Sequence, residues 1–202
     1  MKKIMFNDKY GLTQAVLEGR KTMTRRISTA LNHPNITDIS EWGVDSNGKV
    51  MLSFTYDTGV QEDVYPHFQI SEVVAVAQSY KNINEYLSLM GLCIINPYGS
   101  PMEHPGWNNK MFVAAGLMPH RIRITDIKVE RLQAISDEDC MKEGLLAGEQ
   151  EPGMYGFRLP KGTVLSFPTP RAAFASLIDR ISGKGTFDRN PWVFAYEFEL
   201  IK

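Results

Sequence analysis

The sequence predicts an α+β fold in which a mixed β-barrel is surrounded by peripheral helices. Strand and helix signals alternate along the chain in the order β-α-β-β-β-α-α-β, which is typical of this class. The 202 residues are 43% hydrophobic and 22% charged, enough apolar material for one buried core. No linker separates two cores, so we expect a single domain spanning 1–202, with loop insertions near 28–48, 81–110 and 147–169.

The N-terminal third supplies the first strand and the first helix. Residues 2–6 (KKIMF) are short and β-prone, and they end before Asn7 and Asp8. In the next segment Leu12, Val16 and Leu17 recur at helical spacing, and a C-terminal glycine cap is expected just beyond them.

The middle of the chain is less regular. Residues 28–48 resemble a loop with at most a short helix, whereas 50–56 alternate as a strand does. Residues 70–80 contain three valines and predict a buried strand. Residues 81–110 begin helically and continue into a Pro/Gly-rich stretch, and so long a loop in a compact domain is commonly functional or poorly ordered.

The last third has the clearest signals. Residues 121–133 alternate as a strand, with a change of parity that suggests a bulge near Thr125 and Asp126. Ser136 is a natural N-cap for a helix over 136–146, which Gly144 can terminate. Residues 147–169 are expected to be loop. Residues 169–183 are expected to form a helix with Thr169 as its N-cap and its apolar side inward. A strand over 190–202 closes the chain.

Composition excludes several classes of protein. The net charge is −1, so any anion site must be a local concentration of charge. Two distant cysteines and four scattered histidines predict no disulfide framework, no metal site and no Cys-His dyad at Cys140. The N-terminus lacks a signal-peptide core and no apolar run reaches 18 residues, which predicts a soluble cytoplasmic protein without membrane contact.

The local concentration of charge is the segment GRKTMTRR, residues 19–26. Lysine and arginine beyond a helix end are commonly solvated surface that complements the helix dipole. An extended TMTRR stretch, however, places Thr22, Thr24 and Arg26 on one face and Met23 and Arg25 on the other. Such a turn and strand can gather cations and hydroxyls around a small anionic or carbonyl-bearing ligand.

The chain resembles the ASCH domain, a branch of the PUA-like superfamily. The resemblance rests on the N-terminal strand and helix with GRKTMTRR, on RITDIKVERLQAISDEDCMKEGL, and on FASLIDRISGKGTFDRNPWVFAYEFELI. These segments cover about two thirds of the chain. PUA-like domains are compact β-barrels that commonly bind RNA or modified nucleosides, and one small bacterial ASCH branch hydrolyses the exocyclic amide of N4-acetylcytidine.

The resemblance implies three catalytic residues. The Lys, Thr and Glu of that small branch match Lys21, Thr24 and Glu143 here. In an amide hydrolase Thr24 could supply the nucleophile and Lys21 the base, while Glu143 could pass a proton to the leaving nitrogen. The pKa of Lys21 must then fall by about three units from its ordinary value of about 10.4, through burial or neighbouring cations.

The remaining candidates concern binding. The residues expected to contact an RNA, nucleoside or nucleotide ligand are Arg20, Thr22, Arg25, Arg26, Arg121, Arg123 and Trp107. Arg121 and Arg123 are equally compatible with solvated surface, and Trp107 with anchoring its loop. No cofactor, metal or DNA-specific signal is implied. A non-catalytic RNA-binding module, a ribonuclease and a protein-binding adaptor stay open as alternatives to an amidohydrolase.

Overall fold

A computed structural model describes residues 1–92, 105–148, 152–160 and 162–201 of the chain. Its centre is a five-stranded sheet with the strand order β1-β6-β7-β11-β2. These strands span, in that order, Lys3–Ile4, Val73–Val76, Arg121–Arg131, Trp192–Ile201 and Met23–Ile27. β1 and β6 are parallel and the other neighbours are antiparallel, so the predicted α+β class and the mixed sheet are confirmed.

A closed barrel is not found among the described residues. The outer strands β1 and β2 do not pair with each other. β1 has only two residues and offers little backbone for a ladder. Instead, the Arg26 side chain on β2 donates a hydrogen bond to the carbonyl oxygen of Met5, the residue after β1.

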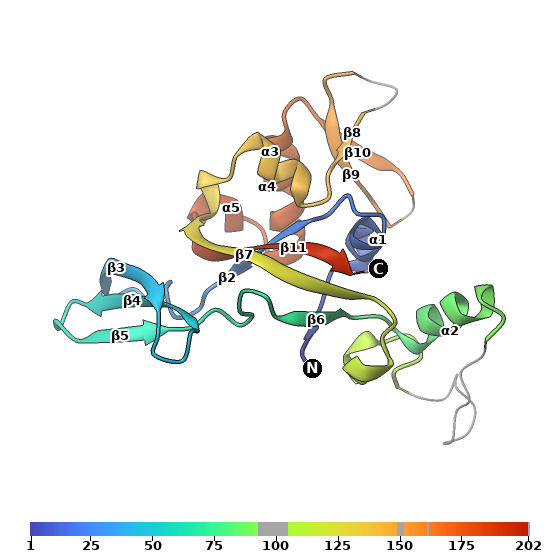
Figure 1. Cartoon of the computed structure of the whole chain (residues 1–202). Helices are drawn as coiled ribbons and strands as arrows, with labels where there is room; N and C mark the ends of the chain where they lie inside the picture. The colour runs from blue at the N-terminus through green and yellow to red at the C-terminus, as the bar shows by residue number, and fades with distance from the viewer. Residues whose placement is uncertain (93–104, 149–151, 161, 202) are drawn as a thin grey trace.

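Two smaller three-stranded sheets flank the central one (Figure 1). One has the order β3-β4-β5, with strands Ile36–Val44, Val50–Tyr56 and Gln61–Val64. The other has the order β10-β9-β8, with strands Val164–Phe167, Tyr155–Arg158 and Leu146–Ala147.

The expectation of loops over 28–48 and 147–169 is therefore wrong. β3 lacks a clear local period, but it gains a partner in β4 and packs Ile36 and Ile39 against the main core. In the segment 81–110, the helix α2 (Tyr80–Leu89) confirms the helical start. Residues 93–104 of that segment lie outside the described residues.

The other helices lie mostly on one side of the central sheet, as Figure 1 shows. They are α1 (Leu12–Leu17), α3 (Asp137–Lys142), α4 (Pro170–Ser182) and α5 (Thr186–Arg189), with 3-10 turns at Asp8–Tyr10, Lys110–Phe112, Ala115–Leu117 and Leu132–Ala134. Two N-caps follow the sequence. The Ser136 hydroxyl accepts from Asp139 N and the Thr169 hydroxyl from Ala172 N, each satisfying an amide that the first helical turn leaves free.

The long strand β7 contains the predicted bulge. Glu197 of β11 pairs with Asp126, and the next residue, Phe198, pairs with Ile124, so Thr125 is the extra residue. Ile122, Ile124 and Ile127 nevertheless all point into the core. The spacing of the apolar residues in β7 changes from two to three at this point. The extra residue of the bulge keeps them all on the buried face of the strand.

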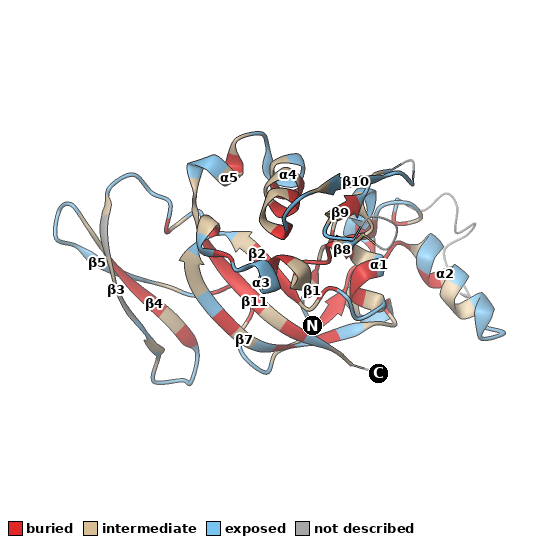
Figure 2. Cartoon of the chain, turned by 90° about the horizontal axis from the view of Figure 1, so that it is seen from above, coloured by how far each residue is buried: buried red, intermediate tan, exposed pale blue. Residues whose placement is uncertain are grey.

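Buried residues line the inner face of the central sheet and the side of α4 that faces it (Figure 2). A smaller apolar cluster under α2 contains Ala75, Ala77, Ile83, Val113 and Met118. In the described parts of the chain, no helix combines the length and apolar character that crossing a bilayer requires.

Candidate active site

The backbone brings the segment after α1 against the end of α3. Thr22 N donates to the carbonyl oxygen of Lys142 at 3.0 Å, and Phe198 N of β11 donates to Thr22 O at 2.8 Å. Lys21 and Glu143 form an isolated antiparallel bridge at the same place. Two sequence segments more than a hundred residues apart are therefore held in a fixed register.

Lys21 and Glu143 meet through their side chains as well. Lys21 Nζ donates to Glu143 Oε2 at 2.6 Å and to the Glu143 carbonyl oxygen at 2.7 Å. Only 2% of Lys21 and 5% of Glu143 is exposed. Glu143 is the C-terminal capping residue of α3, a position where the sequence alone is equally compatible with an exposed carboxylate.

Gly144 makes this close approach possible. It has φ +96°, a conformation that L side chains rarely adopt, and a Cβ built on it would lie 3.1 Å from Lys21 Cβ and 3.3 Å from Ala15 Cβ. A side chain at position 144 would therefore be strained and would also press on Lys21.

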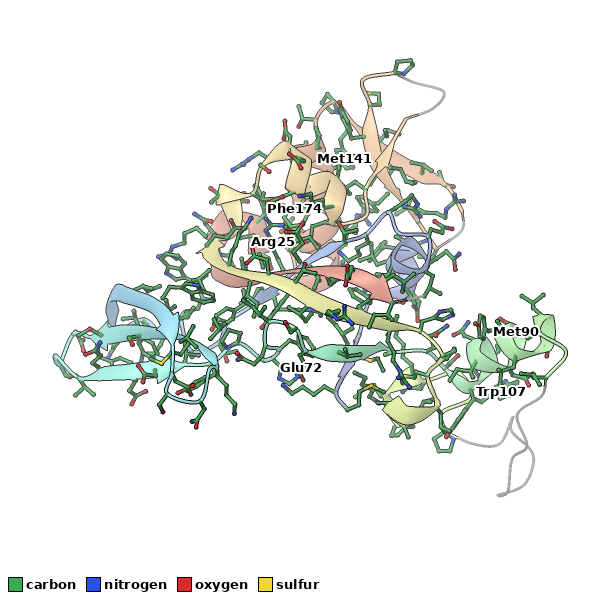
Figure 3. The ribbon with its side chains drawn as sticks, in the orientation of Figure 1. Arg25, Glu72, Met90, Trp107, Met141 and Phe174 are labelled. Atoms are coloured by element: carbon green, nitrogen blue, oxygen red, sulfur yellow. The ribbon has the colours of Figure 1, made fainter. Side chains whose placement is uncertain are left out.

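The pair opens onto a cavity of about 250 Å³ that lies between β2, the segment after β1 and α4. This is slightly below the ~300–1,000 Å³ typical of pockets for drug-sized ligands, so the cavity suits one small ligand. Figure 3 shows Phe174 and Arg25 close together between the sheet and the helices. The lining residues are Met5, Phe6, Asn7, Leu12, Lys21, Thr24, Arg25, Arg26, Ile27, Glu143, Phe174, Leu177, Ile178, Ile181 and Ser182.

Thr24 reaches the cavity from the edge strand β2, where it pairs with Tyr196 of β11. The residue is 5% exposed. Within the described residues the Thr24 hydroxyl has no hydrogen-bonding partner. Its oxygen atom is also not fully buried. The Thr24 hydroxyl is therefore available to a molecule in the cavity.

Arg25 is engaged with carboxylates. Its Nε lies 2.7 Å from Glu130 Oε1, its Nη2 3.0 Å from Asp139 Oδ2 and its Nη1 3.2 Å from Glu143 Oε1. Although burial opposes charge on Arg25, the carboxylates raise the pKa of its guanidinium above the ordinary value. Arg25 thus acts on the site by orienting Glu143. A role as a direct ligand contact is unfavourable because four of its five N–H donors are engaged by Glu130, Asp139, Glu143 and Met23 Sδ.

Burial has a different result at Lys21. It lowers the pKa of the Lys21 ammonium, and although Glu143 opposes this change, the guanidinium groups of Arg26 and Arg25 act in the same direction as burial. The direction is the one that a general-base lysine requires.

An aromatic ring lies beside the cations of the cavity. Lys21 Nζ is 5.8 Å, and Arg26 Cζ 5.9 Å, from the centroid of Phe6. Cations at this separation are attracted by the ring quadrupole, so Phe6 helps to hold both charges in an apolar surrounding.

The structure places the other binding candidates away from the cavity lining. Arg20 is not part of the lining and forms an exposed ion pair with Glu18 at 2.5 Å. Thr22 contributes its backbone to the register described above. Arg121 and Arg123 lie at the far end of β7 and are exposed, and Arg123 pairs with Glu199 at 3.1 Å.

Trp107 is also remote from the cavity. Figure 3 shows it beside α2, well separated from Arg25. Its carbonyl oxygen accepts from Lys81 N of α2 at 3.1 Å. The arrangement agrees with the alternative in which Trp107 anchors its own segment.

Sequence reasoning missed four contributors to the site, namely Phe6, the apolar side of α4, Glu130 and Asp139. Phe6 belongs to a segment that looked like an ordinary first strand, and the apolar side of α4 looked like core. Glu130 and Asp139, which hold Arg25, have no recognisable spacing relative to it. The one available signal was an excess of cations in residues 20–26 that a buried site must balance with carboxylates.

The described residues contain no group of three or more His, Cys, Asp or Glu side chains placed to hold a metal ion. Comparison of the chain with models of protein families, with curated proteins and with solved structures gives no match. Functional inference therefore rests on the geometry of the cavity and on the residues that carry the ASCH resemblance.

Proposed function

We propose that the cavity binds a nucleoside or nucleotide and hydrolyses an exocyclic amide on its base, such as the amide of N4-acetylcytidine. The observation that carries the proposal is the common location of Lys21, Thr24 and Glu143. The three residues line one cavity, although Lys21 and Glu143 are 122 positions apart in the sequence. The resemblance to the ASCH domain implies a catalytic role for the same three positions.

The first step assigned to this set is acylation of Thr24. The neutral amine of Lys21 takes the Thr24 hydroxyl proton as the oxygen attacks the amide carbonyl carbon. The carbonyl oxygen becomes an oxyanion, which the Lys21 ammonium formed in this step stabilises. The C–N bond then breaks, and the proton held by Lys21 passes through the Glu143 carboxylate to the leaving nitrogen.

The second step is hydrolysis of the ester on Thr24. Lys21, again neutral, removes a proton from a water molecule that attacks the ester carbonyl. As the ester C–O bond breaks, the Thr24 oxygen recovers that proton and the acid is released. Hydrogen bonds from Lys21 Nζ to Glu143 Oε2 and to the Glu143 carbonyl oxygen keep the base and the proton shuttle in contact.

Ligand binding without turnover is the second candidate. It is favoured by the fact that Lys21 and Glu143 already form an ion pair with each other, as a purely structural buried pair would. In that case the cavity would hold a nucleoside or an RNA base, and only the binding contacts would matter.

An assay with N4-acetylcytidine tests the proposal. Purified protein should release cytidine and acetate, and Lys21→Met should lower kcat/KM by about 10²–10⁴-fold, the range expected for loss of an acid-base group. Lys184→Met, at an exposed lysine beyond α4, is the matched control and should retain activity. Binding of cytidine without release of acetate would support the second candidate, whereas neither binding nor turnover would reject both.

A further inference from the structure

Arg26 differs from the other two cations of the cavity. Lys21 and Arg25 are each within 3.2 Å of a carboxylate oxygen, whereas Arg26 forms no ion pair with the described residues. Its hydrogen bond within them goes to the carbonyl oxygen of Met5 through one terminal nitrogen. A guanidinium has five N–H donors in a planar fork, so several donors of Arg26 are left for another molecule.

Burying the Arg26 guanidinium without a carboxylate beside it costs free energy. Burial lowers the pKa of its guanidinium below the ordinary value. An arginine still remains charged at neutral pH, because its ordinary pKa is above about 12. The cavity lining thus contains the basic residues Lys21, Arg25 and Arg26 but one carboxylate, and that carboxylate is already bound by Lys21 and Arg25.

The exposure of neighbouring residues shows where Arg26 lies in the cavity. Lys21 and Thr24 are 2% and 5% exposed, whereas Ile27, next to Arg26 on β2, is 40% exposed. On the opposite wall, Ile181 and Ser182 at the end of α4 are exposed too. The cavity therefore opens toward the Ile27 end of β2, with Lys21 at its inner end and Arg26 nearer the mouth.

We infer that Arg26 forms a phosphate subsite near the mouth of the cavity, so that the ligand is a nucleoside 5′-phosphate in preference to an uncharged nucleoside. The inference rests on the proposed function for the nucleoside part of the ligand. The base lies inward, with its amide at Lys21 and Thr24, and the phosphate lies outward at Arg26. A planar guanidinium can bind two phosphate oxygens at once, which fixes orientation as well as charge.

A different role for Arg26 makes a different prediction. If its guanidinium stabilised the oxyanion of the reaction, its loss would lower turnover of a nucleoside and of its 5′-phosphate equally. If it binds the phosphate, its loss should act almost entirely on the phosphorylated substrate.

Kinetics with matched substrates separate these roles. We expect N4-acetylcytidine 5′-monophosphate to have a kcat/KM about 10- to 100-fold above that of N4-acetylcytidine, the range of one charge-assisted contact. Arg26→Gln should remove that preference while the rate with the nucleoside stays within about threefold. Arg158→Gln, at an exposed arginine of β9 outside the cavity lining, is the matched control and should keep the preference. Equal rates for both substrates in the natural protein would overturn the inference.

Binding measurements make the inference independent of turnover. In titration calorimetry cytidine 5′-monophosphate should bind about 10- to 100-fold more tightly than cytidine, with a difference that shrinks as salt is raised. Arg26→Lys, which keeps the charge, should retain part of the difference if Arg26→Gln fails to fold. A phosphate preference without amide hydrolysis would refute the proposed reaction and support the phosphate subsite. Amide hydrolysis without a phosphate preference would support the proposed reaction and refute the subsite.

Discussion

Lys21 Nζ lies 2.6 Å from Glu143 Oε2, and the two side chains are 1% and 7% exposed. Taking two opposite charges out of water costs free energy that their mutual attraction and additional hydrogen bonds must recover. Part of this free energy is offset by the hydrogen bond from Lys21 to the Glu143 carbonyl oxygen. Another part is offset by the hydrogen bond that Glu143 accepts from Arg25. The pair is therefore coupled in stability as well as in the proposed chemistry.

A double-mutant cycle should reveal this coupling. Lys21→Met leaves Glu143 with one cation, and Glu143→Gln leaves a buried lysine without a carboxylate. Each single change should lower the free energy of unfolding by up to about 3–5 kcal/mol, as expected when one partner of a buried pair is removed. The double variant should lose less than the sum, by about 0.5–3 kcal/mol. Denaturant titration measures all four proteins, and strictly additive losses would show that the two side chains do not stabilise each other.

Stability should depend on pH through Lys21. Because burial lowers its pKa in the folded state, the unfolded chain holds this proton more tightly, and the contribution of Lys21 is least favourable at low pH. The free energy of unfolding should then rise with pH from the lowered pKa up to the ordinary value of about 10.4. The natural protein should gain stability relative to Lys21→Met across this window. A relative loss there would mean that attraction to Glu143 outweighs burial and raises the pKa.

Substitution of Gly144 should damage both stability and the site. Gly144→Ala forces alanine to φ +96° and places its Cβ against Lys21. The matched control is Gly153→Ala, where φ is +85° and a Cβ would meet nothing within 4 Å. Both variants should lose about 1–2 kcal/mol from the left-handed backbone, and Gly144→Ala should lose more. Only Gly144→Ala should lower activity. Equal losses of stability in the two variants would argue that Lys21 moves aside at no cost.

Cys140 should resist thiol reagents in the folded protein. It is buried in α3, and burial raises the pKa of its thiol to about 12, so little thiolate forms near neutral pH. In a Cys93→Ser background, labelling at pH 8 should be slow in the folded state and fast in guanidinium chloride. Rapid labelling of the folded protein would show that α3 opens frequently, which the fixed register between Thr22 and Lys142 argues against.

The local elements with strong periodicity could be predicted from the sequence. Alternating isoleucines predicted β7, including the bulge at Thr125, because a change of parity must be absorbed by an extra residue. Ser136 and Thr169 predicted the starts of α3 and α4, since capping depends on residues three positions away. The segment 36–44 could not be predicted, because its strand forms through pairing with β4 and through packing on the core.

The amino-acid sequence by itself determined which side chains could form a site, namely a dense group of cations and hydroxyls over 20–26 and a glutamate after residue 136. It also determined the turn that Gly144 permits. The tertiary structure decided how these side chains are used, because burial and partners are set by segments far apart in the chain. It paired Lys21 with Glu143, bound Arg25 to three carboxylates and paired Arg20 with Glu18. Arg26, near the mouth of the cavity, has no ion-pair partner in the part of the chain that the structure describes.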